Sequence, residues 1–65
     1  MTSQRALLDS AATTIDEIVG RIGAAAEHHE DQGEVDAAND LYDVERSLRA
    51  AHRRLLAVVR RLADD

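Results

Sequence analysis

The residues best suited to chemistry lie together in the stretch 27–31, which reads Glu-His-His-Glu-Asp. Imidazole and carboxylate groups are common ligands of Zn, Ni or Fe, so this stretch is a candidate metal site. Ferritin-like bundles place a Glu three residues before a His, which puts both ligands on one helical face. Here Ala25 and Ala26 stand three residues before His28 and His29, and adjacent residues diverge by about 100° on a helix. The pattern therefore favours polar residues at a helix end over a metal site.

A second possible metal site needs two copies of the chain. Glu45 of one copy and His52 of another could share an ion if the chain dimerises. The metal-binding hypothesis thus involves the following residues: Glu27, His29, Glu30, Glu45 and His52. A histidine at the edge of a helix interface explains His52 more simply, and we expect no metal or other cofactor.

Nucleophilic catalysis has no support in this sequence. Ser3, Ser10 and Ser47 lie in no nucleophile elbow and no recognisable triad, and cysteine is absent. No glycine-rich loop is present to hold a phosphate, and a thin helical bundle offers no deep pocket. The sequence therefore predicts a protein that is not an enzyme.

The stretch 46–62 is strongly basic, with six arginines and no acid. On a helix these arginines form adjacent strips that could follow nucleic-acid phosphates or hold an anionic ligand such as a nucleotide. The candidate anion-binding residues are Arg49, Arg53, Arg60 and Arg61. The net charge of -5, the eight acids in 27–45 and the lack of interleaved aromatic residues argue against this interpretation. Nucleic-acid or nucleotide binding is therefore an alternative hypothesis and not the first one.

The basic helix could also lie on an anionic membrane surface. Its leucines recur at the spacing of a packed bundle, which accounts for them without a membrane. No apolar run approaches the about 20 residues of a membrane span, and the N-terminus lacks the features of a signal peptide. We therefore expect a cytoplasmic protein without a membrane partner. The use of arginine as the only strongly basic residue, together with abundant alanine, suggests a GC-rich bacterial or phage genome.

Apolar residues recur at alternating spacings of three and four residues in two segments, as in packed helices. The first segment runs from Leu8 to His29 and the second from Leu41 to Leu62. We expect these two seams to pack against each other and form the core of an antiparallel hairpin. The predicted core residues are Leu8, Ile15, Ile18, Ile22, Leu41, Val44, Leu48, Leu55, Val58 and Leu62.

The two seams are out of register, so one uninterrupted helix fits poorly, and a break near residues 31–33 restores both. Gly33 can end the first helix in a left-handed conformation. Alternatively Asp31 caps the second helix, with Glu34 three residues later as in a capping box. Ser3 or Thr2 can cap the first helix. The sequence thus predicts a single all-α domain over 1–65, with helices over about 3–30 and 34–63 joined by a turn over about 31–33.

The second helix carries more apolar residues than one hairpin contact can cover. A 65-residue chain without cysteine also needs unusually good packing or oligomerisation to be stable. We therefore expect a homodimer that forms a four-helix bundle, or a larger homo-oligomer. The predicted interface for a second copy or another protein consists of Tyr42, Glu45, Arg49, His52, Leu56 and Val59.

Charge is divided along the second helix, because acids precede residue 46 and arginines follow it. Two such helices side by side attract each other when antiparallel, with a two-fold axis near residues 48–49. That axis would place Glu45 near His52 of the other copy. The arginines would orient partners and add little affinity.

Gly20 and Gly23 lie inside the first helix, where each costs about 1 kcal/mol relative to alanine. They are either tolerated weak positions or places where another helix approaches closely. Taken together, the sequence favours a non-catalytic interaction, adaptor or regulatory protein that homo-oligomerises and binds another macromolecule, with a protein partner favoured over nucleic acid.

Overall fold

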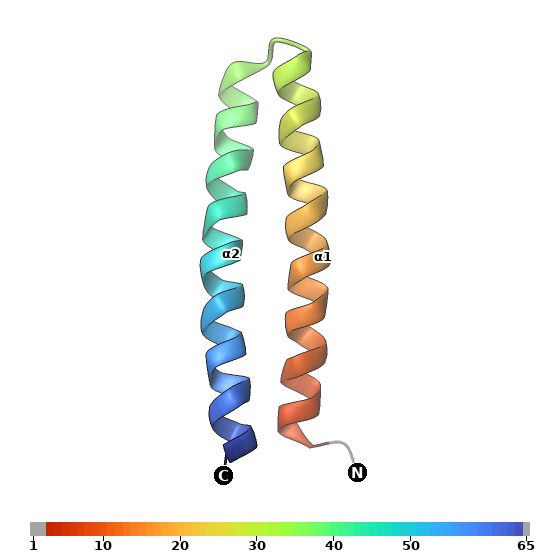
Figure 1. Cartoon of the computed structure of the whole chain (residues 1–65). Coiled ribbons are helices and arrows are strands. Elements are labelled where there is room, and N and C mark those ends of the chain that lie inside the picture. Colours follow the sequence, from red (N-terminus) through yellow and green to blue (C-terminus); the bar gives the residue numbers. More distant parts are fainter. Residues whose placement is uncertain (1–2, 65) are drawn as a thin grey trace.

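The computed structural model describes residues 3–64, with side chains through residue 62, and consists of two helices packed side by side. Helix α1 spans Gln4–Asp31 and helix α2 spans Val35–Asp64. They run antiparallel and are joined by a short turn at the end opposite both termini (Figure 1). This arrangement confirms the all-α hairpin, and each helix boundary lies one residue later than the sequence predicted.

A serine begins α1. The Ser3 hydroxyl accepts a hydrogen bond from the Ala6 backbone N–H at 3.1 Å, and the Ser3 carbonyl accepts one from Leu7 at 3.1 Å. This N-cap provides an acceptor for an N–H that has no partner within the helix. Thr2, the alternative cap in the sequence, lies outside the described residues.

The turn is a Schellman motif centred on Gly33. Gly33 has a φ of 77°, which is a left-handed conformation that only glycine adopts without strain. Its N–H donates to the Glu30 carbonyl at 3.0 Å, and the Glu34 N–H donates to the His29 carbonyl at 2.9 Å. Of the two capping hypotheses, the structure therefore supports the glycine cap, and Asp31 is the last residue of α1.

An ionisable pair reinforces this turn. His29 Nδ1 lies 2.5 Å from Glu34 Oε2, so the two side chains join the last turn of α1 to the residue before α2. In a Schellman motif these two positions are frequently linked by a hydrophobic contact. In this chain a polar contact replaces it, which leaves His29 at the end of the apolar seam as the sequence suggested.

The core of the hairpin is small. Its buried residues are Ala12, Val19, Ala26, Ala38 and Val59. In α1 these residues recur every seven positions, and in α2 the same spacing from Ala38 to Val59 also includes Glu45 and His52. We call these seven residues the contact row. No large side chain in the described part of the chain is fully buried.

The contact row differs from the seam that the sequence predicted. Three predicted core residues are exposed, with relative accessibilities of 37% for Ile18, 44% for Val44 and 38% for Leu62. The other predicted core residues are only half-buried: Leu8, Ile15, Ile22, Leu41, Leu48, Leu55 and Val58. The physical reason is size, because the helices come closest along the row with the smallest side chains and the large residues flank it.

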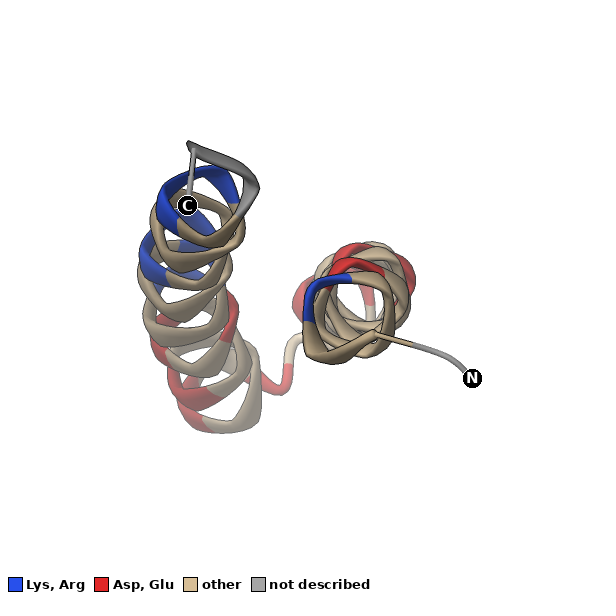
Figure 2. Ribbon diagram, turned by 90° about the horizontal axis from the view of Figure 1, so that it is seen from below, with Lys and Arg blue, Asp and Glu red and all other residues tan. Residues whose placement is uncertain are grey.

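The molecule is thin. Its principal extents are 49 × 19 × 9 Å, so a single layer of two helices makes up the described chain. Such a layer has two broad faces, and no other element of the described chain lies over either of them (Figure 2). Neither described helix is long and apolar enough to cross a membrane.

Candidate interaction surface

One broad face of the hairpin is apolar along most of its length. In α1, Ile15 and Ile22 follow contact-row residues by three positions, and in α2 Leu41 and Leu48 do the same. A shift of three residues from the contact row corresponds to the same rotation about the axis of each helix. Because the two helices are antiparallel, this rotation brings both rows to the same broad face of the hairpin. The next rows on that face are also apolar and include Ile18 and Val44.

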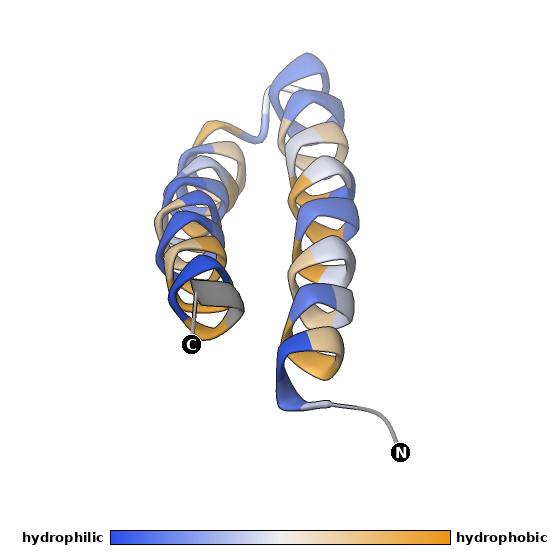
Figure 3. Ribbon diagram, turned by 60° about the horizontal axis from the view of Figure 1, so that its bottom comes forward, coloured by the Kyte–Doolittle hydropathy of each residue, from blue (hydrophilic) through white to orange (hydrophobic). Residues whose placement is uncertain are grey.

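We call this surface the open apolar face. It is formed by Ala11, Ile15, Ile18, Ile22, Ala25, Leu41, Val44, Leu48, Ala51, Leu55, Val58 and Leu62. Each of these side chains is half-buried or exposed, so none is fully covered within one chain. Figure 3 shows strongly hydrophobic segments recurring along both helices. Contiguous apolar surface of this extent is typical of interaction sites.

The opposite face is polar. The Glu45 side chain is 18% exposed, and its Oε2 lies 3.5 Å from an Arg49 guanidinium nitrogen. Gly23 lies across from it on α1, and a Cβ at that position would collide with the Glu45 carboxylate. The atoms that approach Gly23 belong to the end of the Glu45 side chain, and no backbone atom of α2 lies within 4 Å of the added Cβ. Gly23 thus leaves room for a side chain of α2, and close approach of the two helix backbones at this residue stays a prediction. At Gly20, by contrast, an added Cβ would meet no atom within 4 Å.

Residues predicted for the intermolecular interface lie in or beside the hairpin contact instead. Val59 is buried between the two helices, and Glu45 and His52 belong to the contact row. Tyr42 and Leu56 are half-buried beside this row, on the polar face. Arg49, the remaining predicted interface residue, is exposed and pairs with Glu45 of its own chain. Glu45 and His52 both occupy the row that holds their own hairpin together, so a Glu45–His52 contact between copies would compete with the hairpin contact and stays a prediction.

Tyr42 lies near the acidic end of the hairpin. Burial raises the pKa of its phenol above 10.0, and the negative charges of nearby carboxylates raise that pKa further. In decreasing order of effect these carboxylates belong to Glu30, Glu27, Glu45 and Asp31. The two carboxylates with the strongest effect, Glu30 and Glu27, belong to α1, whereas Tyr42 belongs to α2.

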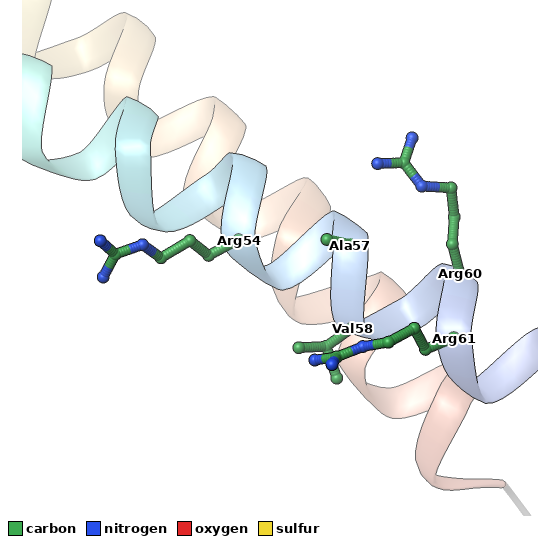
Figure 4. Close-up of a pocket in the computed structure, with 5 residues that line it drawn as sticks. All are labelled: Arg54, Ala57, Val58, Arg60 and Arg61. Carbon is green, nitrogen blue, oxygen red and sulfur yellow. The ribbon is translucent and has the colours of Figure 1, made fainter.

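The arginines do not converge on one site. Arg46 forms an ion pair with Asp43, and Arg49 with Glu45, so the acidic half of α2 takes up two of them. Arg54 and Arg61 extend beside Ala57 and Val58 and form an open hollow, while the Arg60 side chain points away from both (Figure 4). The predicted anion-binding residues Arg49, Arg53, Arg60 and Arg61 are all exposed. Arg49, Arg53 and Arg60 lie in adjacent rows on the polar side of α2, whereas Arg61 borders the open apolar face.

The charge division predicted along α2 is visible in the fold. Acidic residues lie toward the turn and arginines toward the C-terminus (Figure 2). Arg54 and Arg61 lie directly outside the open apolar face, in the same helical row as Asp40 and Ser47. One border of the open apolar face is thus acidic at one end and basic at the other.

The histidine-rich stretch forms the end of α1. The His28 and His29 rings meet edge to face, with centroids 5.4 Å apart, and His29 bonds to Glu34. Among the side chains of residues 3–62, no three His, Cys, Asp or Glu come together in an arrangement that could hold a metal ion.

No protein-family model matches this chain, and neither a curated protein nor a solved structure does. Function must therefore be inferred from the residues and their geometry. The feature that sequence reasoning missed is the contact row, and its signal was the recurrence of small residues such as Ala12, Ala26 and Ala38, with Gly23 beside them.

Proposed function

We propose that this chain is a non-catalytic interaction protein that dimerises into a four-helix bundle through its open apolar face and binds another macromolecule. The observation that supports this proposal is the contrast between core and surface. The buried residues are three alanines and two valines, whereas the large residues Ile18, Val44 and Leu62 are exposed.

Covering the open apolar face would supply the core that the single hairpin lacks. Complete burial of a Leu, Ile or Val side chain contributes about 1.5–3 kcal/mol relative to its exposed state. Part of that contribution is still available at every large residue of the open apolar face, because each is half-buried or exposed. Domains of this size commonly reach stability through such an association.

The surface hollows support a role other than catalysis. One is lined by Arg54, Ala57, Val58, Arg60 and Arg61. Another hollow is lined by Arg5, Ala6, Asp9 and Val59. Neither lining contains a serine, threonine or histidine, so neither sets a nucleophile beside a base. A further macromolecule would bind the polar face, which the dimer leaves exposed with Arg46, Arg53 and Arg60 along it.

Sedimentation equilibrium of the wild type and a matched pair of valine variants tests this proposal. Val44 and Val35 are both exposed in the hairpin, at 44% and 58%, but only Val44 belongs to the open apolar face. Val44→Asp should dissociate the dimer, because it would bury a carboxylate at the interface. Val35→Asp should leave the dimer intact, because this position lies at the start of α2 on the polar face.

The wild type should sediment with twice the chain mass at micromolar concentration. A wild type that remains a folded monomer would contradict the proposal. So would a Val44→Asp variant that associates as strongly as the Val35→Asp control. Circular dichroism of each variant verifies that the helices are intact, so that loss of association is not confused with unfolding.

A further inference from the structure

We infer that the second copy lies antiparallel on the first, with α2 packed against α2 and the two turns at opposite ends of the bundle. This inference rests on the proposed dimer and specifies its orientation. Two orientations can place the open apolar faces of two hairpins together. In the other one, both turns lie at the same end and α2 packs against α1 of the second copy.

The apolar residues of α2 are self-complementary in the first orientation. They recur at spacings of three and four residues from Leu41 to Leu62, so they can form the seam of an antiparallel coiled coil. When the two-fold axis of the dimer passes the middle of α2, each leucine of one copy faces a smaller residue of the other copy. These layers are Leu41 with Val58, Val44 with Leu55 and Leu48 with Ala51. Alternating large and small residues fill each layer evenly.

The border of the seam is complementary in charge. In the same register, Asp40 of each copy lies opposite Arg61 of the other, and Ser47 lies opposite Arg54. Asp40 and Arg61 are both exposed in the single hairpin, so both side chains are accessible to a second copy. The dyad repeats each contact, which gives two acid–arginine pairs per dimer.

The alternative orientation lacks this match. There the border of α2 faces the outer row of α1 of the second copy, which contains Leu7, Thr14, Arg21 and His28. The Glu45 side chain reaches Gly23, so these two residues lie at about the same level of the hairpin, and dimerisation about the long axis would keep that level. Arg61 would then face Leu7, and Arg54 would face Thr14, so neither arginine would meet an acid.

The long-range charges favour the same choice. Stretch 27–45 contains eight acids and stretch 46–62 six arginines, and these stretches lie toward opposite ends of the hairpin (Figure 2). Placing the turns together would bring both acidic stretches to one end of the bundle. Placing them at opposite ends sets each acidic stretch beside the arginines of the other copy. Electrostatic complementarity of this kind mainly determines orientation.

Distance measurement between spin labels tests the orientation. The chain has no cysteine, so Gln32→Cys introduces a single labelling site in the turn. With turns at opposite ends, the two labels should lie about 50 Å apart, since the hairpin is 49 Å long. With turns at the same end they should lie within about 20 Å, because helices in a bundle are about 10 Å apart.

Ser47→Cys provides the matched control. Ser47 is exposed near the middle of α2, so its labels should lie within about 25 Å in either orientation. A short Ser47 distance with a long Gln32 distance would support the inference. Short distances at both sites would overturn the inference while leaving the dimer established. Sedimentation of the labelled chains as monomers would overturn the dimer itself, so the two failures are distinguishable.

Charge reversal provides an independent measurement. Asp40→Arg alone and Arg61→Asp alone should each raise the dimer dissociation constant about fivefold, because each change turns two attractive pairs into repulsive ones. The double variant Asp40→Arg/Arg61→Asp should restore the wild-type constant. Additive weakening in the double variant would contradict the Asp40–Arg61 contact between copies.

Discussion

Replacement of Gly20 by alanine tests which face of the hairpin is covered. Gly20 lies inside α1, is exposed, and an added Cβ would meet no atom within 4 Å. Alanine in a helix interior is favoured over glycine by about 1 kcal/mol, chiefly because glycine loses more backbone entropy. Since no packing cost offsets this gain, Gly20→Ala should stabilise each chain by about 1 kcal/mol.

Gly20 lies on the polar face, away from the proposed contact between copies. In a dimer in which both chains carry Gly20→Ala, the free energy of unfolding should therefore rise by about 2 kcal/mol. A 1 kcal/mol change raises the melting temperature of a 60–100-residue domain by about 4–8 °C. Thermal unfolding followed by circular dichroism measures this shift. Protein concentration must be constant throughout, because the melting temperature of an oligomer depends on it.

Ala24→Gly is the matched control. Ala24 is also exposed in the interior of α1, so the reverse substitution should lower stability by about the same amount. A Gly20→Ala variant that melts below the wild type, with Ala24→Gly behaving as expected, would refute the reasoning. It would mean that another helix approaches α1 closely at Gly20, so the polar face and not the open apolar face would be covered.

Two further predictions concern the turn and the tyrosine. Gly33→Ala should destabilise the hairpin by about 1–2 kcal/mol in chemical denaturation, because φ at this residue is 77°, and Gly33→Asn should be less harmful because asparagine tolerates that conformation better. Equal stability of Gly33→Ala and the wild type would contradict the described turn. Tyr42 is the only tyrosine, and its raised pKa predicts that tyrosinate absorbance appears at higher pH in the folded protein than in urea. Since the unfolded phenol then ionises first, stability should be unaffected below about pH 10 and fall as pH rises from there through the folded-state pKa. Glu30→Gln should lower the pKa of the folded tyrosine, and an unchanged titration would exclude Glu30 as the main charge acting on it.

Much of the fold could be predicted from local patterns. The spacing of apolar residues gave both helices, and the disagreement of register between the two segments placed the turn near Gly33. These features depend on neighbouring residues in the chain, so no knowledge of packing was required. The Ser3 cap is of the same kind, since a hydroxyl before the first turn acts on the backbone beside it.

The identity of the hairpin contact could not be predicted in this way. Helix α2 carries two adjacent stripes with the same spacing, one containing Leu41, Leu48 and Leu55 and the other Ala38 and Val59. The leucine stripe was predicted to pack against α1 because its apolar residues recur at alternating spacings of three and four, as they do in the first helix. Glu45 interrupts the second stripe, and a carboxylate is unfavourable in an apolar core.

The sequence by itself determined two amphipathic helices, a glycine turn between them and a helix α2 whose charges are divided between its two halves. Only the tertiary structure decided which stripe of each helix packs against the other helix. Small residues allow the helix axes to come together, and Gly23 leaves space for the Glu45 carboxylate that made this row look unfavourable. The basic segment 46–62 consequently has its leucines along the open apolar face. Hydrophobic periodicity identifies the stripes, but steric fit between two particular surfaces decides which of them meet.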